Sequence, residues 1–166
     1  MLTNKNSSGA VVEKYIYAYD KAKNILSKED KKGTTSYKYD SLNRLTKVTE
    51  PSGKIIEYTY DKEGNRYTET ETVGTTKTKS IYSYDSSNRL TGINQTINGV
   101  LSNTTAYTYD KNGNTLSKTV TSSSTGAKET TKYSYDVLNQ LTKVTTSKGT
   151  ISYAYNGEGY RIYKKF

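Results

Sequence analysis

A short motif, Tyr-x-Tyr-Asp, recurs along this chain and constrains its fold more than any other feature. Successive copies lie 20 to 26 residues apart, and fourteen of the 18 tyrosines belong to them. Self-similarity at such an interval indicates a repeat architecture, so we interpret the motif as structural. Its seven copies comprise Tyr17, Tyr19 and Asp20; Tyr37, Tyr39 and Asp40; Tyr58, Tyr60 and Asp61; Tyr82, Tyr84 and Asp85; Tyr107, Tyr109 and Asp110; Tyr133, Tyr135 and Asp136; and Tyr153 and Tyr155, followed by Asn156 in place of Asp.

The motif predicts paired strands. Tyrosines at positions i and i+2 share one face of a strand, and the Asp that follows can close the strand with a turn. A Thr-rich segment such as residues 44–49 follows each turn, and a Gly-bearing turn such as Asn98-Gly99, typical of a tight hairpin, leads into the next copy. No window has helical periodicity. The predicted fold is all-β, with about fourteen strands in consecutive antiparallel hairpins that form a curved or spiralling sheet.

The residues after the Asp suggest two turn lengths in alternation. The shorter turn ends in Asn three positions on, as at Asn43, whereas the longer one runs one residue further, as at Asn65. The predicted structural period is therefore a pair of motifs, about 41 to 51 residues.

The segments after the shorter turns carry apolar residues three positions apart, as in Leu45 and Val48. In a flat strand these two would lie on opposite faces. Either a β-bulge brings them to one face or both faces are partly covered; we favour the bulge, which would also bend the sheet.

Composition limits the core and the partners. Leu, Ile, Val and Phe are scarce, and we expect the Tyr pairs to replace them in the core, because a Tyr ring can be buried while its hydroxyl remains wet. Contact of exposed rings such as Tyr67, Tyr160 and Tyr163 with sugars is the alternative. The net charge is +9, but without a dense basic cluster we interpret it as a solubilising coat of Lys and expect no specific nucleic-acid partner.

Metal, membrane and catalytic functions have little support. Each turn supplies one Asp where Ca²⁺ needs six to eight oxygens, so we expect no metal or cofactor. Arg44, Arg66, Arg89 and Arg161 follow the turns and are expected to pair with Asp of their own or a neighbouring unit. The chain has no His and no Cys, which excludes Ser-His, Cys-His and common zinc arrangements. We therefore expect no enzyme, and no apolar segment is long enough to span a membrane.

The units at residues 37–46, 107–114 and 153–161 resemble the YD repeats of the RHS, wall-associated and teneurin-like families. The resemblance extends from about residue 11 to 166 and implies a hairpin strip that spirals into a hollow shell. Bacterial members enclose a C-terminal toxin in this shell, while animal members support adhesion. The Asp-Pro-x-Gly-rich plug of the complete family is missing here, so its self-cleavage and toxin activities have no matching residues.

We therefore expect residues 11–166 to be a seven-copy array forming the wall of a YD shell from a secreted or cell-surface bacterial protein. Its partners would be the remainder of its parent chain, including the cargo, and other copies through edge strands. The alternative function is binding of cell-wall polysaccharide. Residues 1–10 lack the apolar stretch of a signal peptide; we expect them to be disordered or an artefact of expressing a fragment.

Overall fold

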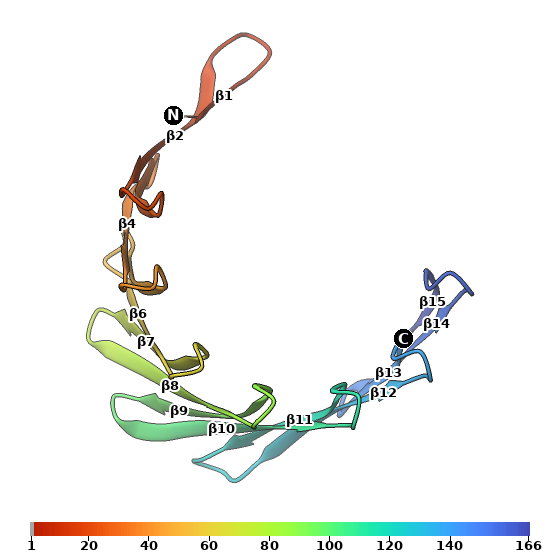
Figure 1. Cartoon of the computed structure of the whole chain (residues 1–166). Coiled ribbons are helices and arrows are strands. Elements are labelled where there is room, and N and C mark those ends of the chain that lie inside the picture. Colours follow the sequence, from red (N-terminus) through yellow and green to blue (C-terminus); the bar gives the residue numbers. More distant parts are fainter. Residues whose placement is uncertain (1) are drawn as a thin grey trace. The chain divides into compact units, whose positions relative to one another are not determined.

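The computed structural model describes residues 2–166, and the strands in this range run antiparallel and follow one another in chain order, each beside the next (Figure 1). The strands are β1 (Leu2–Lys5), β2 (Val11–Tyr19), β3 (Ile25–Asp30), β4 (Gly33–Tyr39), β5 (Leu45–Thr49), β6 (Ile55–Tyr60), β7 (Arg66–Val73), β8 (Thr76–Tyr84), β9 (Leu90–Ile97), β10 (Val100–Tyr109), β11 (Thr115–Ser122), β12 (Lys128–Tyr135), β13 (Leu141–Thr146), β14 (Gly149–Tyr155) and β15 (Arg161–Lys165). No helix occurs in residues 2–166. The predicted all-β array of consecutive antiparallel hairpins is confirmed.

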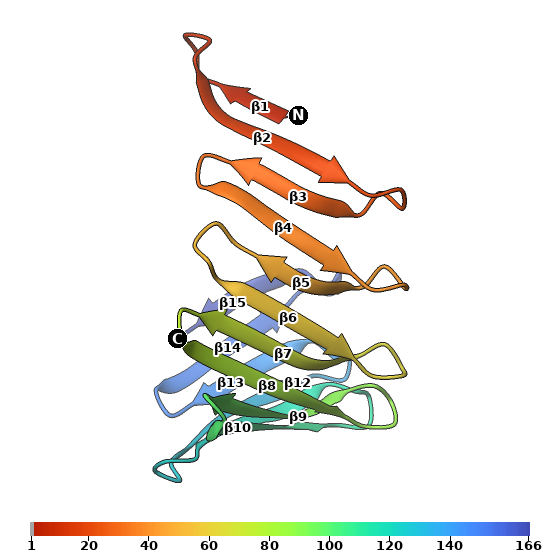
Figure 2. The same cartoon turned by 90° about the vertical axis from the view of Figure 1, so that its left-hand side faces the viewer.

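The strands divide into two compact units. One unit contains residues 1–80 together with the hairpin tip at 97–99, and the other contains residues 81–96 and 100–166. In the first unit, the Asp turns follow β2, β4 and β6 at one edge of the strip, and the Gly-bearing hairpin turns lie at the opposite edge (Figure 2). This separation follows from antiparallel order, since successive connections alternate between the two ends of the strands.

The N-terminal residues differ from the expectation of disorder. Leu2–Lys5 form β1, which pairs with the first half of β2, from Leu2 opposite Tyr15 to Lys5 opposite Val11. Asn6 closes the intervening turn, because its Oδ1 accepts hydrogen bonds from the backbone N–H groups of Ser8 and Ala10. These contacts supply the local order that composition alone does not predict. A domain boundary at residue 10 remains a prediction.

The Gly-bearing turns adopt the backbone that their sequences predict. Asn98 and Gly99 have φ of +49° and +86°, the pair of positive values that a type I′ hairpin requires. Asn98 Oδ1 also accepts the backbone N–H of Lys77 at 2.8 Å. The Asn-Gly hairpin is thus confirmed.

The molecule has little interior. Among residues 2–166 no hydrophobic side chain is buried, and the buried residues are Thr68, Thr70 and Ser80, each 8% exposed. Most motif tyrosines are half-buried, and the rings of Tyr17 and Tyr19 have centroids 6.3 Å apart. The Tyr rings are thus partly covered and form no closed core. Hydrogen bonds of the backbone and of the repeated side chains must carry much of the cohesion.

Candidate functional site: the turn edge of the repeats

All seven motif copies end in the same turn. The backbone N–H of the motif Asp donates to the carbonyl four residues later, and its own carbonyl accepts the N–H three residues later, at 2.9–3.2 Å. Asn156 makes both bonds in the seventh copy. The expectation of two alternating turn lengths is therefore wrong. The Asn residues that suggested two lengths occupy different positions of the same turn: Asn43 is the third residue after its Asp, and Asn65 is the fourth.

The third residue after the Asp has a left-handed backbone in every copy, with φ between +58° and +89°. Gly and Asn adopt this conformation at least cost, which explains why these two residue types occupy the position in six of the seven copies. Only the first copy places another residue there, Lys23, with φ of +68°. The occupants are Lys23, Asn43, Gly64, Asn88, Gly113, Asn139 and Gly159.

The motif side chain caps the turn. In each copy its Oδ1 accepts the backbone N–H of the fourth residue on, at 2.7–3.0 Å. The second oxygen accepts a side-chain donor from the same residue in several copies, such as the amide of Asn24 at Asp20 and Arg44 Nε at Asp40. These residues therefore act as caps, as their position in the sequence predicts.

Hydrogen bonds to the ionised caps lower their pKa values. The Asn24 side chain is the main cause of the lowered pKa of Asp20, and the Asn114 side chain has that role for Asp110. The backbone N–H of Arg44 is the main cause of the lowered pKa of Asp40. A donor to a carboxylate favours its charged form, so these caps are ionised at neutral pH.

In at least six copies the strand after the turn carries a β-bulge. The bulge lies opposite the second Tyr of the motif, which is on the strand before the turn. In the second copy Tyr39 is opposite Leu45 and Tyr37 is opposite Val48, so one extra residue lies between. Leu45 and Val48 consequently lie on the face of the Tyr pair. The bulge that we favoured is confirmed for this copy, and the sixth copy repeats the same register.

The second Tyr of a copy links its unit to the preceding one. Its hydroxyl donates to the carbonyl of the first residue after the previous turn: Tyr39 to Ile25 at 3.0 Å and Tyr60 to Leu45 at 2.7 Å. The bonds of Tyr109 to Leu90 and Tyr155 to Leu141 have the same form. The acceptor lies at the bulge, where the strand ladder is locally disrupted. Burial raises the pKa of Tyr39 and Tyr109, so these hydroxyls remain protonated donors.

Two further contacts connect neighbouring turns. The Asn24 amide donates to Asn43 Oδ1 at 2.8 Å, and the Asn114 amide donates to Asn139 Oδ1 at 2.7 Å. In the other half of the alternation Arg44 and Arg89 take the place of this Asn, and the sixth copy has Gln140 there. The Arg44 guanidinium lies 4.5 Å from the centroid of the Tyr60 ring, in the next unit, a favourable cation–π distance.

The expectation that all four arginines pair with Asp is correct for two of them. Arg44 binds Asp40 at 2.8 Å and Arg89 binds Asp85 at 2.7 Å. Arg66 instead pairs with Glu69 at 2.7 Å, because it is one position further from the Asp. Arg161 lies over the Tyr153 ring at 5.5 Å.

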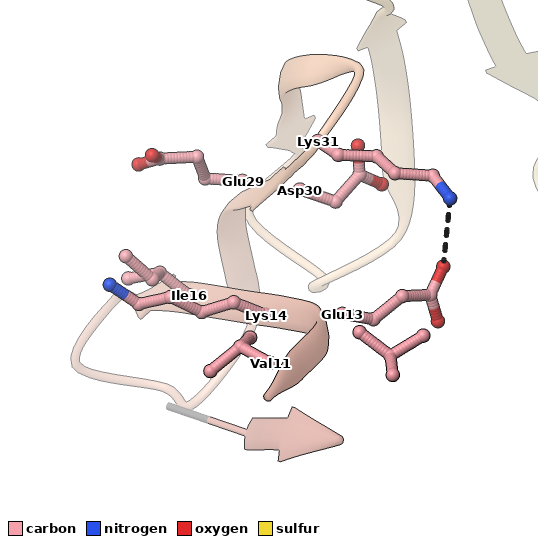
Figure 3. A pocket seen from close by; sticks show the side chains of 8 residues that line it. Val11, Glu13, Lys14, Ile16, Glu29, Asp30 and Lys31 are labelled. Carbon is pink, nitrogen blue, oxygen red and sulfur yellow. Dashed lines mark ion pairs between the residues drawn. The ribbon is translucent and has the colours of Figure 1, made fainter. Parts of the chain in front are cut away.

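A hollow of about 300 Å³ lies between β2 and the turn that ends β3 (Figure 3). Three of its charged groups are paired. Lys31 Nζ is 3.7 Å from Glu13, which also accepts the Tyr15 hydroxyl. Asp30 pairs with Lys28 at 2.9 Å. Because Glu13, Asp30 and Lys31 are engaged in these contacts, we assign no ligand to this hollow.

Residues 2–166 contain no group of three or more acidic side chains arranged to hold a metal ion. None of them forms a helix that could traverse a lipid bilayer.

The RHS Repeat family matches residues 19–55 and 39–76. Each match spans two of the turns described above. No curated protein matches this chain.

Several solved structures share the strand arrangement. A crystal structure of TcdB2-TccC3 without its hypervariable C-terminal region superposes with a TM-score of 0.68 and 17% identity, over 97% of this chain and 10% of that one. The Photorhabdus luminescens Tc holotoxin pore gives 0.50 at 14% identity, over 98% and 13%. A porin-like protein from Bacteroides uniformis gives 0.55 at 13% identity, over 96% and 78%. At such identities the likeness concerns the fold alone. The chain spans only about a tenth of the length of the toxin-complex chains that it matches.

Proposed function

This chain is an RHS-repeat protein, a type also called a YD-repeat protein, and we propose on that basis that it is a non-catalytic structural segment in the wall of a larger shell. The observation that carries the proposal is the hydroxyl bond from four of the motif copies to the unit before them. The hydroxyls of Tyr39 and Tyr60 donate to backbone carbonyls of the preceding unit. These motif side chains therefore connect one repeat to the next. These atoms are engaged by the chain itself and are not presented to a substrate.

The cargo, the partners and the location of the protein are further parts of the proposal. We propose that the shell encloses or displays a C-terminal toxin or effector of a secreted or surface bacterial protein. The repeat family supports this, as does the fold shared with TcdB2-TccC3. The partners of residues 11–166 would then be the rest of the shell and its cargo.

Limited proteolysis of the full-length product of the encoding gene tests this function. The proposal predicts that its C-terminal segment resists protease, and that replacing Tyr39 and Tyr60 by Ala makes this segment cleavable by weakening the wall. The matched control replaces Tyr67 by Ala, since this exposed side chain makes no hydrogen bond, ion pair or ring contact with any described residue. Equal cleavage of the C-terminal segment in all three proteins would contradict enclosure.

A second candidate function is binding of cell-wall polysaccharide. Exposed rings favour it, because Tyr67, Tyr160 and Tyr163 are 51%, 68% and 48% exposed and an aromatic face can stack on a sugar. Co-sedimentation with insoluble cell walls tests this function. Binding that is lost when these three tyrosines become Ala would support the sugar-binding function over the scaffold, whereas absence of binding would exclude it.

A further inference from the structure

The face opposite the Tyr pairs carries hydroxyl and amino groups. In the first unit a row runs across the sheet from Lys38 on β4 to Lys47 on β5, Glu57 on β6 and Thr70 on β7, each opposite the next. Thr59 and Thr68 form the adjacent pair, with their hydroxyl oxygens 2.7 Å apart. This face therefore differs in chemistry from the Tyr face, and the motif does not explain it.

These residues line a hollow of about 450 Å³, together with Lys79 of β8. Thr68 and Thr70 are among the few buried residues, each 8% exposed. These lining residues are held in place by the sheet, so their hydroxyls can donate to a ligand at low entropic cost. A volume of this size can accommodate a molecule as large as a sugar.

The charges in the hollow do not balance. Lys38 and Lys47 are directly opposite, an arrangement of like charges that destabilises a sheet. Glu57 compensates Lys47, with Nζ and Oε1 3.2 Å apart. Lys38 and Lys79 have no ion pair with any described residue, which leaves two uncompensated ammonium groups beside the hydroxyls.

We propose that this hollow binds an anionic sugar, a hydroxylated ring that carries a carboxylate or a phosphate. Lys38 and Lys79 bind the anionic group, and the hydroxyls of Thr59, Thr68 and Thr70 bind those of the ring. The anion also compensates the repulsion between Lys38 and Lys47. This function is separate from the scaffold role, since these side chains lie on the face that the Tyr bonds do not use.

The test is an NMR titration of the protein with glucuronate, glucose 6-phosphate and neutral glucose. We expect the amide signals of Thr59, Thr68 and Thr70 to shift with at least one of the two anionic sugars. The sugar that binds more tightly shows whether the hollow prefers a carboxylate or a phosphate. Glucose should bind much more weakly. Replacing Lys38 and Lys79 together by Ala should weaken binding by about tenfold, since two charge-assisted hydrogen bonds are lost.

The control replaces Lys132 and Lys143 by Ala. These residues of β12 and β13 lie on the face opposite the Tyr pair of their own copy. The control therefore removes the same charge and leaves the residues of the hollow unchanged. An equal loss of affinity in both double variants would show diffuse attraction to a basic surface and overturn the proposal. Equal binding of glucose, or no shift with either anionic sugar, would also overturn it. Replacing Thr70 by Val provides a milder variant, which should weaken binding while both lysines remain.

Discussion

Removing one hydroxyl should show how strongly successive units are held together. The Tyr60 hydroxyl donates to the Leu45 carbonyl at 2.7 Å across the boundary between two units, and its ring lies under the Arg44 guanidinium. Replacing Tyr60 by Phe keeps the ring and removes only the hydrogen bond. The half-buried Leu45 carbonyl would then lose this donor.

A hydrogen bond of this kind contributes about 0.5–1.5 kcal/mol to the free energy of unfolding. With a urea dependence of about 1–3 kcal/mol per molar, a loss of about 1 kcal/mol lowers the midpoint of unfolding by about 0.3–1 M. Replacing Tyr60 by Leu also removes the ring, and so should cost a further 0.5–1 kcal/mol, roughly the value of an exposed cation–π contact. Urea unfolding followed by circular dichroism measures both changes.

Tyr67 provides the control, because it is close in sequence and 51% exposed, and its side chain makes no hydrogen bond or ring contact with any described residue. Replacing Tyr67 by Phe should leave the midpoint unchanged. If the Phe variants at Tyr60 and Tyr67 unfold at the same urea concentration, the hydroxyl bond contributes nothing and our account of the coupling between units is wrong.

Three further predictions concern the turns and the edges. Replacing Lys23 by Gly should stabilise the fold by roughly 0.5–1 kcal/mol in thermal or urea unfolding, because Lys23 has a φ of +68° that costs a non-Gly residue energy; a loss of stability would contradict the strain. The pKa values of four capping aspartates, Asp20, Asp40, Asp85 and Asp110, lie below their ordinary 3.8, so at these groups the folded state binds fewer protons than the unfolded state. The stabilisation that these carboxylates supply is complete above that pH and is lost as the pH falls through the lowered pKa values. Urea unfolding at pH 6 and pH 2.5 should therefore show that the variant with Asn at Asp40 and Asp85 loses less unfolding free energy between the two pH values than the wild type does. The edge strands β1 and β15 leave backbone groups unpaired, so light scattering should detect self-association that is reduced when Ile162 becomes Pro; a monomer at every concentration would exclude it.

The repeat made the strand order predictable from the sequence. Each Tyr pair fixes a strand and each Asp its end, so the hairpin array required no tertiary information. The bulge at Leu45 and Val48 was also accessible, because apolar residues three apart conflict with a period of two. These predictions depend on local chemistry that the motif repeats.

The turn geometry and the links between units were not accessible in the same way. Asn43 and Asn65 look equivalent in sequence. Asn43 nevertheless occupies the left-handed position of its turn, whereas Asn65 is one residue beyond that position in its own turn. Counting from the Asp to a fixed fourth residue would have aligned the turns, since Arg44 and Asn65 then occupy the same place. The hydroxyl bond from Tyr60 to Leu45 spans fifteen residues, and the register between β5 and β6 determines it.

The Tyr rings are only partly covered for a physical reason. A sheet buries a face only when another layer covers it, and residues 2–166 contain neither a helix nor a buried hydrophobic side chain. The scarcity of aliphatic residues is therefore not compensated by Tyr burial within this chain. Half-buried rings and directed hydrogen bonds take the place of a core.

The scaffold function is tested most directly by single-particle electron microscopy of the full-length product of the encoding gene. Our account predicts that residues 11–166 appear as consecutive hairpins in the wall of a closed hollow body, with each turn beside the next at one edge of the strip. A map in which these residues form a separate module outside any shell, or in which the gene product forms no enclosed body, would contradict it.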